Sequence, residues 1–248
     1  MSHLQVEIKL FGNKNLIFIF FFIVFFYCFG KAQADPIEVV IGNQTWSSKN
    51  YLNGIFQSGE YIPYANSAAE WQFYAESRIS ACTAMNFDSS LIEEFGLFYN
   101  WFAITDVRGL APPGWRIPSK QDIEELSVFL GPSFAKALKS QGLWEMEKCI
   151  SCALKGMSCG ECKSESRKKR YTDFGNGTNS SGFDAMPAGA ISENGIFRNV
   201  DNEAIFWLSD CIIETNLAYC FPLRFGFDDA FPNYQTKGMG FNVRLLKE

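Results

Sequence analysis

Residues 96–126, GLFYNWFAITDVRGLAPPGWRIPSKQDIEEL, carry the clearest structural signal in this 248-residue chain. Pro118 ends an extended segment, and the hydroxyl of Ser119 can then cap the free N–H groups of a helix. Asp122 lies three residues further on, where its carboxylate can reach back to the Ser119 backbone and complete a capping box. We therefore predict a helix that begins at Ser119 and is stopped by Gly131-Pro132.

Helical and extended segments on both sides of this motif predict the fold class. Residues 134–138 are expected to form a second short helix capped by Ser133, and the first helix is expected to bury one apolar face: Ile123, Leu126, Phe129 and Leu130. Short β-branched and aromatic runs bounded by Gly, Asn and Pro predict strands: 37–41 at a sheet edge, 205–208, 218–225 and 240–246. Because strands stand at both ends with helices between them, we predict an α+β domain whose terminal strands pair in one sheet.

The N-terminal residues have the order of a secretory signal peptide. Lys9 and Lys14 precede an unbroken apolar run over residues 16–29, and Ala32-Gln33-Ala34 follows it. A run of this length is short for a membrane span, which takes about 20 residues. We predict that residues 1–34 are a signal peptide cleaved between Ala34 and Asp35; an uncleaved membrane anchor is the alternative.

Cleavage would leave one domain, residues 35–248, that does not span a membrane and lies in the periplasm, at the cell surface or outside the cell. A hydrophobic content of 47% is enough to bury a core. The one histidine is His3, so the exported domain would contain no imidazole for a catalytic triad or a metal site. We therefore expect no catalysis, and the net charge of −5 argues against nucleic-acid binding.

Four cysteines form two CxxC pairs separated by six residues: Cys149, Cys152, Cys159 and Cys162. Four thiolates on two tight turns can surround one structural zinc ion. An oxidising compartment equally favours two disulfides across the same segment. In both cases the expected role is to hold together a polar insertion at about residues 145–172, and no other cofactor is expected.

The remaining cysteines of the exported domain are expected to be structural. Cys211 and Cys220 lie in or beside neighbouring predicted strands, so a disulfide between them would close a short loop. Cys82 is then left over and is expected to be a buried thiol, a small apolar filler of the core.

Aromatic side chains supply the candidate binding residues. Four tryptophans among apolar neighbours are expected in the core: Trp46, Trp101, Trp115 and Trp207. Four other aromatic residues lie in polar, loop-like sequence and are the candidates for an exposed ligand-binding surface: Tyr51, Tyr61, Tyr64 and Trp71.

Four segments together resemble the Fibrobacter succinogenes major paralogous domain, a family of exported bacterial proteins. They are IGNQTW (41–46), the stretch 96–126, NSSGFDAMPAG (179–189) and GFNVRLLKE (240–248). The resemblance covers nearly the whole exported domain, with residues 145–172 as an insertion. Leu245 stands where the family usually has a cysteine, so a family disulfide at that position is impossible here.

The resemblance implies a fold similar to C-type lectin-like and formylglycine-generating-enzyme-like domains, with paired terminal strands, two short helices and a long loop-rich half. It implies no activity. The calcium-binding lectin signature is absent, because Phe231-Pro232-Asn233 has its shape without the carboxylate.

Export, aromatic content and this resemblance together favour a non-catalytic binding module at the cell surface or envelope, with a glycan as the expected ligand. One alternative is a structural envelope protein that contacts other surface proteins. The other is a polysaccharide hydrolase that uses a carboxylate pair which no spacing in the sequence singles out.

Overall fold

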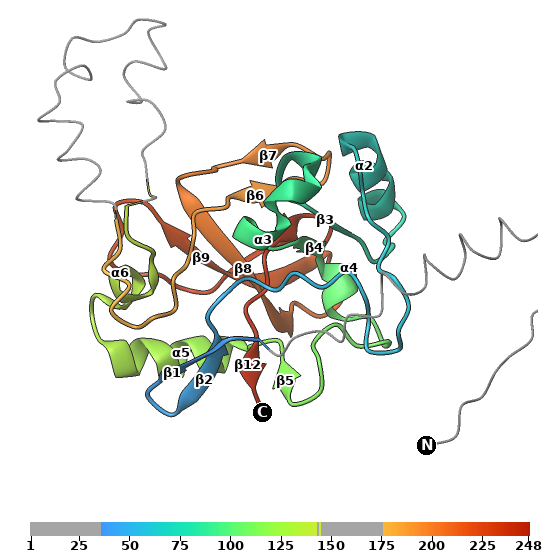
Figure 1. Ribbon diagram of the computed structural model, residues 1–248. Coiled ribbons are helices and arrows are strands. Elements are labelled where there is room, and N and C mark those ends of the chain that lie inside the picture. Colours follow the sequence, from blue (N-terminus) through green and yellow to red (C-terminus); the bar gives the residue numbers. More distant parts are fainter. Residues whose placement is uncertain (1–35, 143, 145–175) are drawn as a thin grey trace, which may run out of the picture. The chain divides into compact units, whose positions relative to one another are not determined.

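Short strands, nearly all antiparallel, form three sheets in the part of the chain described by the computed structural model: residues 36–142, 144 and 176–248 (Figure 1). The strands are β1 (Glu38–Ile41), β2 (Gln44–Ser47), β3 (Cys82–Thr83), β4 (Phe98–Asn100), β5 (Trp115–Arg116), β6 (Ala190–Ile191), β7 (Phe197–Arg198), β8 (Glu203–Cys211), β9 (Leu217–Arg224), β10 (Asn233–Thr236), β11 (Gly240–Phe241) and β12 (Leu246–Lys247).

The helices are few and short. They are α2 (Ala68–Glu76), α3 (Ile92–Phe95), α4 (Trp101–Ile104), α5 (Lys120–Leu130) and α6 (Phe134–Leu138), with 3₁₀ turns η1 (Met85–Phe87) and η2 (Ser89–Leu91). The predicted α+β class is confirmed. In the described part of the chain, none of these helices combines the length and apolar character needed to cross a bilayer.

The terminal strands share one sheet, in the order β1-β2-β12-β5. Leu246 of β12 lies opposite Trp46 of β2 on one side and Arg116 of β5 on the other. At the outer surface, Lys247 Nζ is 2.5 Å from a carboxylate oxygen of Glu38, which joins the two ends of the domain. The terminal strands share one sheet, as predicted, but they do not pair with each other, because β2 lies between β1 and β12.

The C-terminal segment departs from the prediction of one strand over residues 240–246. It forms β11 in the sheet β3-β4-β11-β6-β7 and then β12 in the terminal sheet. Between the two, the carbonyls of Val243 and Leu245 accept hydrogen bonds from the N–H groups of Tyr51 and Ser47, both at 2.8 Å. The segment therefore passes from one sheet to the other, because its backbone groups find partners in the loop after β2 rather than in one continuous ladder.

The two predicted helices are present as α5 and α6. Ser119 and Asp122 form the predicted capping box of α5, and α5 packs along the terminal sheet (Figure 1), with Gln44 Nε2 donating to the Asp122 carbonyl at 3.0 Å. Two details are wrong. Ser133 makes no side-chain cap at α6, and Phe129 is 62% exposed, because its ring lies against Gly42 in the turn between β1 and β2 rather than in the core.

The core contains the four tryptophans predicted for it: Trp46, Trp101, Trp115 and Trp207 are all buried. They divide between two apolar clusters on opposite faces of the sheet β10-β9-β8. Trp207 packs with Tyr99 and Phe241 on one face, whereas Phe206 packs with Trp46 on the other. Since neighbouring residues of β8 point to opposite faces, both clusters depend on the register of this strand.

Arg244 lies at the centre of the domain and is 1% exposed. Its Nε donates to Asn50 Oδ1 at 2.7 Å, and its Nη atoms donate to the carbonyls of Ser47, Phe183 and Asp184. Burial lowers the pKa of the guanidinium to about 9, which still leaves it charged at neutral pH. This one side chain therefore joins the C-terminal segment, the end of β2 and the segment 183–184.

We predict that Arg244→Lys lowers the free energy of unfolding by about 3 kcal/mol, because the shorter ammonium cannot reach all of these acceptors and leaves buried carbonyls unpaired. Urea unfolding followed by tryptophan fluorescence measures the change. The exposed Arg198→Lys on β7 is the matched control and should stay within about 0.5 kcal/mol. Equal stability of the two variants would contradict the role of Arg244.

Lys139 is a second buried cation, at 1% exposure. Its Nζ donates to the carbonyls of Arg224 (3.0 Å) and Phe227 (2.9 Å) and lies 5.3 Å from the centre of the Trp144 ring. Burial lowers its pKa to about 8. The unfolded chain therefore binds this proton more tightly than the folded protein does.

We predict that the free energy of unfolding rises by up to about 3 kcal/mol between pH 8 and the ordinary lysine pKa of about 10.4, as the folded protein releases the proton that the unfolded chain retains. Below pH 8 both states are protonated, so this contribution is constant. Chemical unfolding across this pH range should show the rise in the wild type and a smaller rise in Lys139→Met. Identical pH profiles for the two proteins would contradict the assignment.

Candidate functional site

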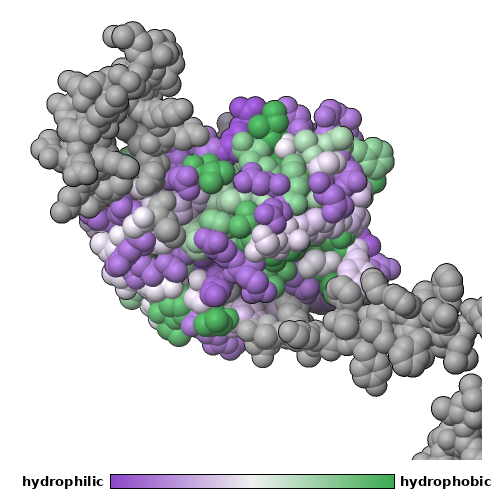
Figure 2. All heavy atoms as spheres, turned by 45° about the horizontal axis from the view of Figure 1, so that its top comes forward, coloured by the Kyte–Doolittle hydropathy of each residue, from purple (hydrophilic) through white to green (hydrophobic). Residues whose placement is uncertain are grey.

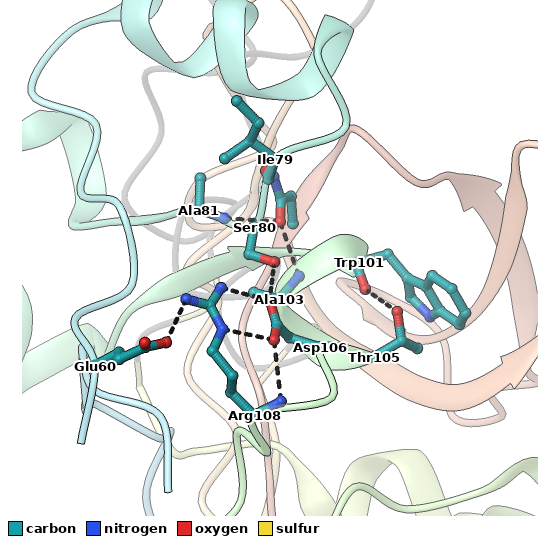
Figure 3. Close-up of polar contacts among 10 residues, drawn as sticks. Glu60, Ile79, Ser80, Ala81, Trp101, Ala103, Thr105, Asp106 and Arg108 are labelled. Atoms are coloured by element: carbon teal, nitrogen blue, oxygen red, sulfur yellow. Dashed lines mark hydrogen bonds and ion pairs between the residues drawn. The ribbon is translucent and has the colours of Figure 1, made fainter. Parts of the chain in front are cut away.

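The central motif of the sequence builds a network around Arg108 (Figure 3). The guanidinium donates to both carboxylate oxygens of Asp106, at 2.8 and 2.7 Å, and to Glu60 at 2.9 Å. Its central carbon also lies 4.1 Å from the centre of the Phe56 ring. These contacts hold the Asp106 pKa well below its usual range, first because of the hydrogen bonds from Arg108. Arg108 thus joins the loop that contains Glu60 to the loop that follows α4.

Backbone contacts strengthen the same junction. The N–H groups of Gln57 and Ser58 donate to the carbonyls of Gly109 (2.8 Å) and Arg108 (3.3 Å). Asn100 holds the underlying turn, because its Oδ1 accepts from the Ala81 and Ala103 amides (3.0 and 3.1 Å) (Figure 3). The polar residues of the motif therefore bond to one another and to the backbone, and they fix the conformation of the loop after α4 and the loop that contains Glu60.

The joined loops present two exposed large hydrophobic side chains, Tyr61 at 62% and Val107 at 102% exposure. We call Glu60, Tyr61, Val107 and Arg108 the loop surface. It combines an aromatic ring and an aliphatic side chain with a fixed ion pair. Hydrophobic and hydrophilic residues are also interspersed over short distances on the face drawn in Figure 2.

Of the four aromatic residues predicted to be exposed, only Tyr61 is. Tyr51 is buried, with its hydroxyl donating to the Leu110 carbonyl at 3.1 Å. Trp71 is completely buried, because Ser67 caps α2 and turns that residue into the core. Tyr64 is half-buried, and its hydroxyl accepts from the Ala84 amide at 3.2 Å.

A different aromatic cluster lies on the sheet β10-β9-β8. Tyr219 of β9 and Tyr234 of β10 are direct cross-strand partners, with ring centres 6.3 Å apart in an edge-to-face arrangement. Tyr234 is 50% exposed, and Lys120 Nζ lies 4.4 Å from the centre of the Tyr219 ring. We call Lys120, Tyr219 and Tyr234 the tyrosine–lysine surface. This surface could not be predicted from the sequence, because it is the pairing of β9 with β10 that brings the two tyrosines together.

The predicted disulfide between Cys211 and Cys220 is absent: both are free thiols. A register shift in β8 places Cys211 opposite Ala218, while Cys220 lies opposite Trp207. Cys82 is a buried thiol, as predicted, and burial raises its pKa to about 12.

The four CxxC cysteines, Cys149, Cys152, Cys159 and Cys162, lie outside the described residues, as do residues 1–34, so both predictions stay open. Among residues 36–142, 144 and 176–248, no group of three or more His, Cys, Asp or Glu side chains is arranged to hold a metal ion.

We predict that Arg108→Gln loosens the loop surface and leaves the core intact. Loss of the ion pairs should loosen the loop junction only modestly, because this arginine is partly exposed and its ion pairs are screened by solvent. Native-state hydrogen exchange should then be about fivefold faster at the Gln57 and Ser58 amides and unchanged in β8. Arg198→Gln is the control, and equal exchange in both variants would contradict the junction.

The comparison with protein families matches nearly the whole of the described domain. No curated protein and no solved structure matches the chain. The family model described as the Fibrobacter succinogenes major domain matches residues 39–247, from β1 to β12. This chain therefore belongs to the Fibrobacter succinogenes major domain family.

Proposed function

We propose that this protein is an exported, non-catalytic binding module of the cell surface or envelope, and that it recognises glycans through the tyrosine–lysine surface. The observation that carries the proposal is the half-exposed Tyr234 ring, held edge-to-face against Tyr219 beside the lysine ammonium. The signal-like N-terminus and the resemblance to lectin-like domains support the same interpretation.

The physical argument starts from the rigidity of the tyrosine pair. Pairing of β9 with β10 fixes both tyrosines, so little side-chain entropy is lost when a ligand covers the exposed ring. The flat CH face of a sugar can pack on an aromatic ring, while phenolic hydroxyls donate and accept hydrogen bonds.

A protein partner is the second candidate, and the loop surface favours it. Tyrosine and arginine are enriched among the residues that dominate binding energy in protein interfaces. Here Arg108 is already fixed by Asp106 and Glu60, and Val107 beside it is fully exposed. Such a surface would suit a structural role among envelope proteins.

We predict that Tyr234→Ala weakens binding of the exported protein to its best-bound polysaccharide about tenfold. Affinity electrophoresis through gels containing single polysaccharides measures the retardation, with a panel of neutral and acidic polymers. Tyr61→Ala removes an exposed tyrosine from the other surface and should leave the retardation unchanged. Thermal unfolding of both variants checks that the fold is retained.

Two results would contradict the glycan proposal. One is the absence of retardation in every polysaccharide of the panel. The other is a stoichiometric protein partner, captured by crosslinking in intact cells, whose capture Val107→Glu abolishes; this would move the function to the loop surface.

A further inference from the structure

The ammonium of Lys120 is positioned at the edge of the tyrosine pair without an acidic partner. Its Nζ lies 4.4 Å from the centre of the Tyr219 ring. None of the ion pairs found within the described parts of the chain includes this lysine. A cation over an aromatic face keeps its charge available, because the ring provides no counter-charge of its own.

The backbone of Lys120 is fixed on both sides. Its N–H donates to Asp210 Oδ2 of β8 at 2.8 Å, and the preceding Ser119 is held in the capping box with Asp122. The Asp210 carboxylate is thus engaged by the backbone at the start of α5. The backbone position from which the lysine side chain extends is therefore fixed. This limits the conformational entropy that would be lost when the ammonium forms an ion pair with a ligand.

Lys237 provides an internal comparison. Its Nζ also lies over an aromatic ring, 4.8 Å from the centre of Trp101, but it donates to the Thr215 carbonyl at 2.9 Å. The Trp101 ring belongs to a buried residue. The two lysines are therefore similar in chemistry, but only Lys120 stands beside an exposed tyrosine.

From this arrangement we propose that the tyrosine–lysine surface selects polysaccharides that carry carboxylates, namely polymers of uronic acids. The sugar ring would pack on Tyr234, and its carboxylate would form an ion pair with Lys120. The chain as a whole carries a net charge of −5, so long-range electrostatic attraction would not draw a polyanion to it. Selectivity for an acidic polysaccharide therefore has to come from a local cation. This inference rests on the proposed function and names the class of glycan.

The test compares acidic polymers with their uncharged esters, so that only the charge differs. Polygalacturonate and its methyl ester, and alginate and its propylene glycol ester, are the probes, with the exported protein and affinity electrophoresis. We expect at least one acidic polymer to bind more tightly than its ester. Lys120→Gln should weaken that binding about fivefold, Lys120→Arg should keep it, and Lys237→Gln should leave it unchanged. Raising the salt concentration should reduce the difference between polymer and ester.

Three outcomes of this binding test would contradict different parts of the proposal. Equal binding of each acidic polymer and its ester would overturn the selectivity and leave the glycan proposal standing. Equal losses in Lys120→Gln and Lys237→Gln would overturn the local site in favour of diffuse charge. No binding to any of these polymers, nor to the neutral polysaccharides of the wider panel, would overturn the proposed function together with this inference.

Discussion

The fold depends on one buried guanidinium, that of Arg244, which donates hydrogen bonds to backbone carbonyls of two separate segments and to the side chain of Asn50. Arg244 is nearly inaccessible, yet no carboxylate is among its hydrogen-bond partners, which are the Asn50 amide oxygen and carbonyl groups. The rings of Phe183 and Phe206 lie against it, with centres 4.6 and 5.6 Å from its central carbon. Peptide dipoles and aromatic faces therefore stabilise its charge. Every segment that supplies one of these groups must be folded before the charge can be buried. This explains how a domain with such short strands can have a defined arrangement of loops.

A similar principle operates at the surface. Arg108 uses Asp106 and Glu60 to fix two loops, and Lys120 is fixed through its backbone by Asp210. In both places a network of charged side chains that resembles a ligand-binding site serves a structural role: it positions two loops in one case and the start of α5 in the other. Beside these networks lie the exposed Tyr61 and Val107 in one place, and the exposed Tyr234 with the Lys120 ammonium in the other. Residues 96–126 thus mainly position loops and the start of α5; of the groups offered to a ligand, Val107 and Lys120 belong to this stretch, whereas Tyr61 and Tyr234 come from elsewhere in the chain.

Local patterns in the sequence predicted local structure well. The capping box at Ser119 and Asp122 depends on residues three positions apart, and the burial of four tryptophans follows from their apolar neighbours. The burial of Trp71 was not predicted, because it depends on helix α2, which Ser67 caps and which places the Trp71 ring in the core. The pairing of Cys211 with Cys220 failed because a bulge in β8 shifts the register, and the Tyr219–Tyr234 contact depends on strand pairing. Most properties set by residues close in sequence could be predicted, with the Ser133 cap and the burial of Phe129 as exceptions, whereas those set by strand register could not.

The ion pair between Glu38 and Lys247 shows that the polypeptide enters and leaves this domain at nearly the same point. The first and last strands of the domain therefore lie close together rather than at opposite poles. A short bridge could join its two ends, and new ends could then be opened in an exposed turn without disturbing the four-stranded sheet. A pulling force applied to the two ends of the domain would act first on the terminal sheet, so β1 and β12 would carry that force before the rest of the domain does.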